Sequence, residues 1–128
     1  MTVTTSSDIA LTGIGSQHVR QIQGNPYGDK SINNYLTPAA FALPATGAYG
    51  DGGSGTVAGP GTWQFDAAVS RTFQLRETQR LEFRAEAFNV TNAFRMNNPG
   101  TVLNSNTFGQ VTSAQDPRIM QFALKYFF

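Results

Sequence analysis

The feature that most constrains this chain is a period-two alternation of apolar and polar side chains over residues 63–128. It occurs in three stretches, at about 63–75, 80–90 and 118–128. Alternation with this period indicates β-strands that have two unlike faces. In the middle stretch, one face carries Leu81, Phe83, Ala85 and Ala87, and the other carries Arg80, Glu82, Arg84 and Glu86. The sequence therefore predicts an all-β fold of antiparallel strands.

The lengths and connections of these stretches indicate a membrane. Each stretch has about ten residues or more, which meets the roughly 9–11 that a tilted strand needs to cross a bilayer. Strands of soluble proteins average about 5–6 residues. The first two stretches are joined by a short polar turn, Arg76 to Gln79, whereas the polar loop 91–117 separates the second from the third. Short turns at one end and long loops at the other are typical of outer-membrane barrels.

In a barrel, the two strand faces would meet lipid and lumen. Only helices and closed barrels span a bilayer, because every backbone polar group must be paired there. No run approaches the roughly 18–20 apolar residues of a membrane-spanning helix. The polar faces then predict a set of lumen-facing charges: Asp66, Glu82, Arg84, Glu86 and Lys125. For the middle strand alone, the solvated face of a soluble sheet explains the pattern equally well.

Aromatic residues gather near the ends of the predicted strands, as in interfacial girdles. Trp63 and Phe65 lie near one end, and Phe73, Tyr126 and Phe128 near the other. Arg71 is the exception to the pattern, because it falls on an apolar face. Either its side chain snorkels to the headgroups, or a β-bulge turns it inward.

Residues 1–62 are predicted to be an irregular loop region. The segment Ala45–Gly61 is dense in glycine and cannot sustain a helix or a central strand. Pro38 to Phe41 is predicted to form one helical turn, with Thr37 as its cap. Ile9 to Ile22 is predicted to form a short hairpin.

The composition excludes several kinds of site. Cysteine is absent, so disulfides, thiolate metal sites and cysteine nucleophiles are excluded, and nine Lys and Arg against eight Asp and Glu give no basic stripe for nucleic acid. His18 is the only histidine. Glu82 and Glu86 share a face with Arg84 between them, which favours paired charges over acid–base catalysis. We therefore expect no catalytic residue, no metal ligand, no cofactor and no enzymatic activity.

The end of the chain, Asp116 to Phe128, resembles the last strand of TonB-dependent outer-membrane receptors. The most similar type is the Oar-like class, which carries an amino-terminal carboxypeptidase-regulatory-like domain. The resemblance runs from about Gly24 to the end and departs from the family at Ser54 to Ala58, where the family usually carries an Asn- and Arg-bearing segment. The other matching stretches are Ala39–Phe41, Tyr49–Gly50, Gly59–Gly61 leading to Asp66 and Arg71, Leu81–Asn89 with Asn92, and Phe108–Gln110.

The resemblance implies a fragment of a receptor in the bacterial cell outer membrane. The barrel-assembly machinery would read a carboxyl-terminal signal made by Phe122, Leu124, Tyr126 and Phe128. The turn Arg76 to Gln79 would be periplasmic, and residues 1–62 and 91–117 would be extracellular loops that contact an unknown ligand. The implied partners are membrane lipid, the assembly machinery, the plug and remaining strands of the receptor, and TonB through an amino-terminal part outside this sequence.

Two other readings remain open. Several copies could pool their strands into an oligomeric outer-membrane anchor, because three strands cannot close alone and the smallest common barrels have eight. Alternatively, the chain could be a soluble, secreted β-sandwich that binds carbohydrate or a surface partner, if its apolar faces packed into a core.

Overall fold

The computed structural model describes residues 1–128, which form two compact units. Unit 1 comprises Met1–Gly61 and Met96–Ala114, and unit 2 comprises Thr62–Arg95 and Gln115–Phe128. The predicted loop 91–117 is thus divided, with its central part in unit 1. The chain has no helix with the length and apolar character to cross a bilayer.

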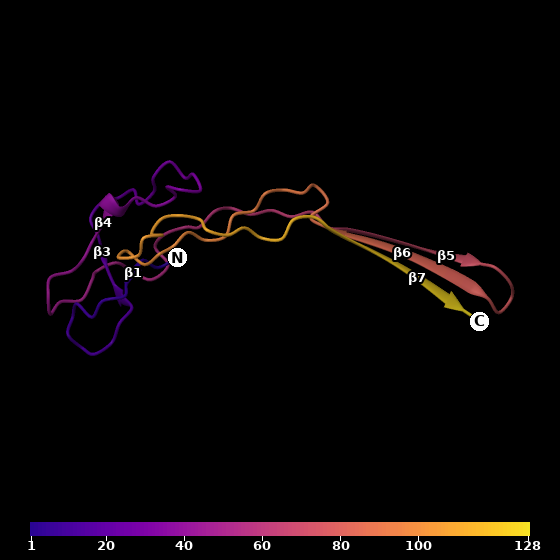
Figure 1. The fold of residues 1–128 in the computed structure, drawn as a ribbon, viewed down its shortest axis with the longest axis horizontal. Helices are drawn as coiled ribbons and strands as arrows, with labels where there is room; N and C mark the ends of the chain where they lie inside the picture. Colours follow the sequence, from indigo (N-terminus) through magenta and orange to yellow (C-terminus); the bar gives the residue numbers. More distant parts are fainter. The chain divides into compact units, whose positions relative to one another are not determined.

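Unit 2 is a three-stranded antiparallel sheet in the order β5-β6-β7, and Figure 1 shows the strands side by side. The strands are β5 (Ala67–Gln74), β6 (Arg80–Phe88) and β7 (Ile119–Phe127), each somewhat shorter than predicted. The turn between β5 and β6 is closed by the backbone N–H groups of Leu75 and Arg76, which donate to the Gln79 carbonyl at 2.9 and 3.1 Å. The predicted antiparallel all-β fold is confirmed.

The register of the sheet aligns the like faces of the three strands, although the polar face ends in the apolar pair Phe88–Ile119 and also carries Phe127. The apolar face has the rows Ala67–Ala87–Met120, Val69–Ala85–Phe122, Arg71–Phe83–Leu124 and Phe73–Leu81–Tyr126. The opposite, polar face has the rows Ala68–Glu86–Gln121, Ser70–Arg84–Ala123, Thr72–Glu82–Lys125 and Gln74–Arg80–Phe127. The pairing is continuous through Arg71, so no bulge turns this residue inward.

Unit 1 contains only short regular elements. β1 (Thr4–Thr5) pairs with β2 (Gln17–His18), and β3 (Arg20–Gln21) pairs with β4 (Phe41–Ala42). The hairpin predicted within Ile9–Ile22 is therefore wrong, because β2 and β3 find their partners outside that stretch.

The helical turn predicted near Pro38 is confirmed as the 3-10 helix η1 (Pro38–Ala40). Proline occupies its first turn and Thr37 its N-cap position, although the Thr37 side chain makes no capping hydrogen bond. The fixed φ of proline suits a first helical position, which explains why the sequence signal was reliable here.

Unit 1 has a hydrophobic core drawn from distant parts of the chain. Phe41 and Phe108 meet edge to face, with ring centroids 5.7 Å apart. Val57, from the glycine-dense segment, is completely buried, and the amino-terminal ammonium donates to its carbonyl. The buried core residues are Val3, Val19, Tyr35, Leu36, Ala40, Phe41, Val57, Phe108 and Val111.

Gly109 illustrates why this compact unit needs glycine. Its φ is +72°, and a Cβ there would overlap the Leu36 carbonyl. The close approach lets the backbone N–H groups of Tyr35 and Leu36 donate to the Gly109 carbonyl at 2.8 and 3.3 Å. Glycine adopts this left-handed backbone without the steric cost of a side chain.

Candidate functional site

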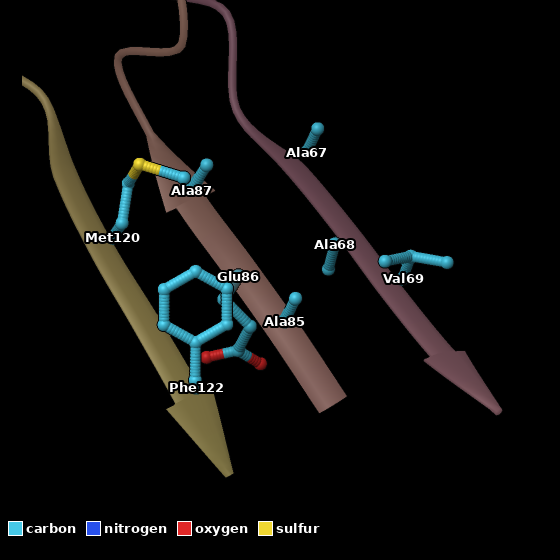
Figure 2. Close-up of a pocket in the computed structure, with 8 residues that line it drawn as sticks. All are labelled: Ala67, Ala68, Val69, Ala85, Glu86, Ala87, Met120 and Phe122. Carbon is cyan, nitrogen blue, oxygen red and sulfur yellow. The ribbon is translucent and has the colours of Figure 1, made fainter. Parts of the chain in front are cut away.

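The apolar face of unit 2 is not covered by any second layer of that unit. Val69, Phe122 and Leu124 are 63%, 65% and 67% exposed. Phe83 and Phe122 stack across β6 and β7 with ring centroids 6.4 Å apart. Figure 2 shows Met120 and Phe122 of β7 beside the small side chains of β6, with those of β5 on the far side of β6. A continuous apolar surface of this kind marks a contact with a membrane or another protein.

The polar face brings together four of the five charges predicted to face a lumen. Arg84 Nε lies 3.4 Å from Glu86 Oε1, and Glu82 stands in register with Lys125. The fifth, Asp66, precedes β5 and interacts with the end of β6 instead. With Arg80, the face opposite the apolar one carries five charged residues, as a surface exposed to water would.

Asn89 connects the ends of three strands, at the end of the sheet opposite the Leu75–Gln79 turn. It is completely buried and has a φ of +52°. Its Nδ2 donates to the carbonyls of Ala93 and Asp116 at 3.1 and 3.5 Å, and its Oδ1 accepts from the Ala93 N–H at 2.9 Å. Its own N–H donates to Asp66 Oδ1 at 2.9 Å. Through its backbone N–H and its side-chain amide, Asn89 thereby links the start of β5, the end of β6 and the approach to β7.

Further polar contacts surround Asn89. The Arg118 N–H donates to Asn92 Oδ1 at 3.0 Å, and Arg95 Nη2 donates to the Asp116 carbonyl at 2.9 Å. Arg95 also contacts the Gln64 side chain. We call Gln64, Asp66, Asn89, Asn92, Arg95 and Asp116 the strand-end network. From the sequence, Asn89 and Asn92 were indicated only by the family resemblance, and Asp66 was predicted as a lumen-facing charge and not as a partner of Asn89, because alternation carries no information on contacts beyond the strands.

Aromatic residues lie at or near both ends of the apolar face. Trp63 and Phe65 precede β5, and Phe73, Tyr126 and Phe128 lie near the turn end. The ten residue steps from Trp63 to Phe73 would span about 33 Å if fully extended, or about 23 Å across a membrane at a 45° tilt. That is close to the roughly 25 Å apolar band between the aromatic girdles of outer-membrane barrels.

Unit 1 presents a loop, Ile9–Ser16, that is organised by a carboxylate. Asp8 accepts hydrogen bonds from the backbone N–H groups of Thr12 and Gly13 at 2.9 and 2.6 Å, and from Gln17 Nε2 at 2.6 Å. The Thr12 N–H is the main reason that the pKa of Asp8 lies below its ordinary value. Leu11 and Ile14 remain 71% and 68% exposed in this loop. Such a preorganised apolar tip is a candidate for ligand contact.

A comparison with protein families identifies the kind of protein to which this sheet belongs. A family model described as an outer membrane beta barrel domain matches residues 1–121. The chain belongs to this family. No curated protein and no solved structure matches it.

Membership of the outer membrane beta barrel domain family places the protein in the bacterial outer membrane, as the sequence predicted. Barrels of this kind present an apolar band outward, and the exposed apolar face of β5, β6 and β7 has the character of such a band. The reading as a soluble β-sandwich loses its support, since it required this face to be packed into a core.

Proposed function

We propose that this outer-membrane barrel chain is part of a TonB-dependent receptor that takes up a scarce ligand. The chain would contribute the last barrel strands and the extracellular loops that first meet the ligand. The observation that carries the proposal is the folded body formed by unit 1. In chain order its two segments, Met1–Gly61 and Met96–Ala114, precede β5 and lie between β6 and β7, and neither interrupts the short connection from β5 to β6.

The buried core of unit 1 makes this unit better suited to ligand binding than a loop without a core would be. It has its own buried core, so its surface loops stand on a fixed scaffold. Binding residues are commonly found on loops held in this way. Leu11, Ile14 and Tyr49, which is 73% exposed, are the apolar candidates for ligand contact. The hairpin from Tyr27 to Leu36 adds an exposed polar tip.

The remaining parts of the receptor would complete the barrel. Three strands are too few to close, since the smallest common barrels have eight. The outer edges of β5 and β7 have no partner in this sheet, and we propose that other strands of the receptor pair with them. The polar face, with Glu82, Arg84, Glu86 and Lys125, would face the lumen and the plug, and no residue would act in catalysis.

An uptake assay tests the proposal. Cells that lack the protein are supplied in turn with a siderophore, a vitamin, an oligosaccharide and a peptide, each labelled. We expect uptake of one ligand to be lost in the deletion strain and restored by the intact gene. Restored uptake should also stop when an uncoupler dissipates the proton-motive force.

Two results would contradict the receptor proposal. Uptake that continues after uncoupling would indicate a passive pore. Unchanged uptake of all four ligand classes in the deletion strain would leave the protein without this transport role.

A variant with Leu11 and Ile14 both changed to Ser tests whether the Ile9–Ser16 loop contacts the ligand. At an unchanged level in the outer membrane, this variant should retain the barrel and bind less ligand.

A further inference from the structure

Arg71 is the only charged residue on the apolar face of the sheet. It stands in register with Phe83, and Leu124 follows on the next strand. Its guanidinium lies over the Phe73 ring, 5.2 Å from the ring centroid. The two ion pairs of the chain are Arg20–Asp51 and Arg84–Glu86, so Arg71 has no carboxylate partner. A cation on a lipid-facing surface therefore lacks any protein group that would neutralise it.

Arg71 lies close enough to the end of β5 for its side chain to reach a lipid headgroup. It lies three positions before Gln74, where β5 ends. This corresponds to about 10 Å along the strand and about 7 Å across the membrane at a 45° tilt. A long arginine side chain can lie along apolar surface over much of that depth and place its charge at the interface. Phe73, beneath the guanidinium, lies on the turn side of Arg71 and supports this direction.

The surroundings of Arg71 fit an anionic group attached to an apolar tail. Phe73, Leu81 and Tyr126 form the next row toward the turn. The Tyr126 ring stacks on Phe128 at 6.0 Å, and its side chain combines an apolar ring with a polar tip that suits an interface. By contrast, Arg84 on the polar face already has Glu86 as a partner.

We propose that Arg71 binds the phosphate of a glycerophospholipid in the periplasmic leaflet of the outer membrane. The planar guanidinium can donate two parallel hydrogen bonds to phosphate oxygens, and the Phe73 ring holds it in place. The occupant is a lipid because the face around the guanidinium is apolar, which suits acyl chains and not a dissolved ion. The leaflet follows from the short turn, since short turns of these barrels are periplasmic. The inference needs the membrane location but not the uptake proposal.

Native mass spectrometry of the assembled protein, extracted from outer membranes, tests this site. Phosphatidylglycerol is titrated into the detergent solution, and the occupancy of the tightest lipid adduct is compared between variants. We expect Arg71→Gln to weaken phosphatidylglycerol binding about tenfold, as loss of a charge-assisted bidentate contact predicts. Arg71→Lys, which keeps the charge and loses the planar fork, should weaken it about threefold. Diacylglycerol with the same acyl chains should bind equally to all variants.

The matched control is Arg84→Gln, which removes the same charge from the opposite face and should leave lipid binding unchanged. Heat-dependent mobility in electrophoresis checks that each variant is assembled. If Arg71→Gln does not assemble, the comparison of the wild type with Arg71→Lys tests the proposal. Equal phosphatidylglycerol binding by the wild type and the assembled Arg71 variants would overturn the proposal. Displacement of the lipid by millimolar inorganic phosphate would overturn it too, as would an equal loss in Arg84→Gln.

Discussion

At the scale of single residues, Asn89 has the greatest structural consequence. A left-handed backbone is uncommon for a residue with a side chain, and Asn tolerates it better than most. At this position the left-handed conformation turns the chain out of β6 and directs the buried amide toward Ala93 and Asp116. The same residue therefore ends one strand and fixes the starts of its two neighbours.

The first prediction concerns Asn89. We expect Asn89→Ala to lower the free energy of unfolding of the assembled barrel by about 3 kcal/mol, from lost hydrogen bonds and left-handed strain. Asn89→Gly avoids the strain and should lose only about 2 kcal/mol. Urea unfolding in lipid vesicles measures both. Equal stabilities for the wild type and the two variants would show that the amide contacts do not hold the strand ends.

A second prediction follows from the lowered pKa of Asp8. A carboxyl whose pKa is lower in the folded protein stabilises the fold above its unfolded pKa of about 3.8, and this contribution disappears as the pH falls through the folded pKa. We therefore expect the Ile9–Ser16 loop to open below pH 4. The protection of the Thr12 and Gly13 amides against hydrogen exchange, measured relative to the intrinsic rate at each pH, should fall there. In Asp8→Asn this protection should already be low at pH 7, and strong protection in this variant at both pH values would refute the role of the carboxylate.

A third prediction separates two glycines of unit 1 that share a left-handed backbone. Gly109 and Gly55 have φ values of +72° and +71°, but only at Gly109 would a Cβ overlap a backbone atom, the Leu36 carbonyl. Gly109→Ala should expose the unit 1 core and make it sensitive to protease. Gly55→Ala, with open space around its Cβ, should lose only about 1 kcal/mol. Similar protease resistance of both variants would mean that the close approach at Leu36 is not required.

At the scale of elements, the strands could be predicted from the sequence and unit 1 could not. Alternation reveals which face a residue occupies, because the two faces of β5, β6 and β7 meet different surroundings. The pairing register aligns the like faces of neighbouring strands, so that Phe83 of β6 stands between Arg71 of β5 and Leu124 of β7. The sequence also left open whether a bulge turned Arg71, since a bulge depends on backbone pairing and not on side-chain type.

The fold of unit 1 could not be predicted from the sequence because its contacts join distant segments of irregular chain. Thr4 bridges to Val102, and Val57 enters the core from a segment whose glycines suggested only a flexible loop. Neither contact has a local periodicity that could reveal it. The turn at Pro38 was the exception, because proline restricts the backbone at its own position.

The final strand carries the fourth prediction, at the element scale. β7 ends at Phe127, and Phe128 follows it, 93% exposed and stacked on Tyr126. If Phe122, Leu124, Tyr126 and Phe128 form the assembly signal, Phe128→Ser should reduce the folded barrel in the outer membrane severalfold. Phe127→Ser is the control, because Phe127 lies on the polar face over Arg80. An equal effect of both changes would show that no face-specific signal is read.

At the scale of the whole molecule, the two faces of unit 2 require a larger assembly. An apolar face of exposed side chains and two unpaired strand edges would aggregate in water. Lipid on one side and closure with further strands remove both problems, because closure leaves no edge. The family match and the geometry of the sheet lead to the same conclusion from independent starting points.

The central claim is that successive residues of β6 point in turn toward lipid and toward a watery lumen. Because the chain has no cysteine of its own, single cysteines can be placed from Leu81 to Glu86 and spin-labelled in the assembled protein. Collisions with oxygen, which concentrates in lipid, should peak at 81, 83 and 85, and collisions with a water-soluble nickel complex at 82, 84 and 86. Equal access of the nickel complex to both sets, or exclusion of both reagents from the odd positions, would contradict the account.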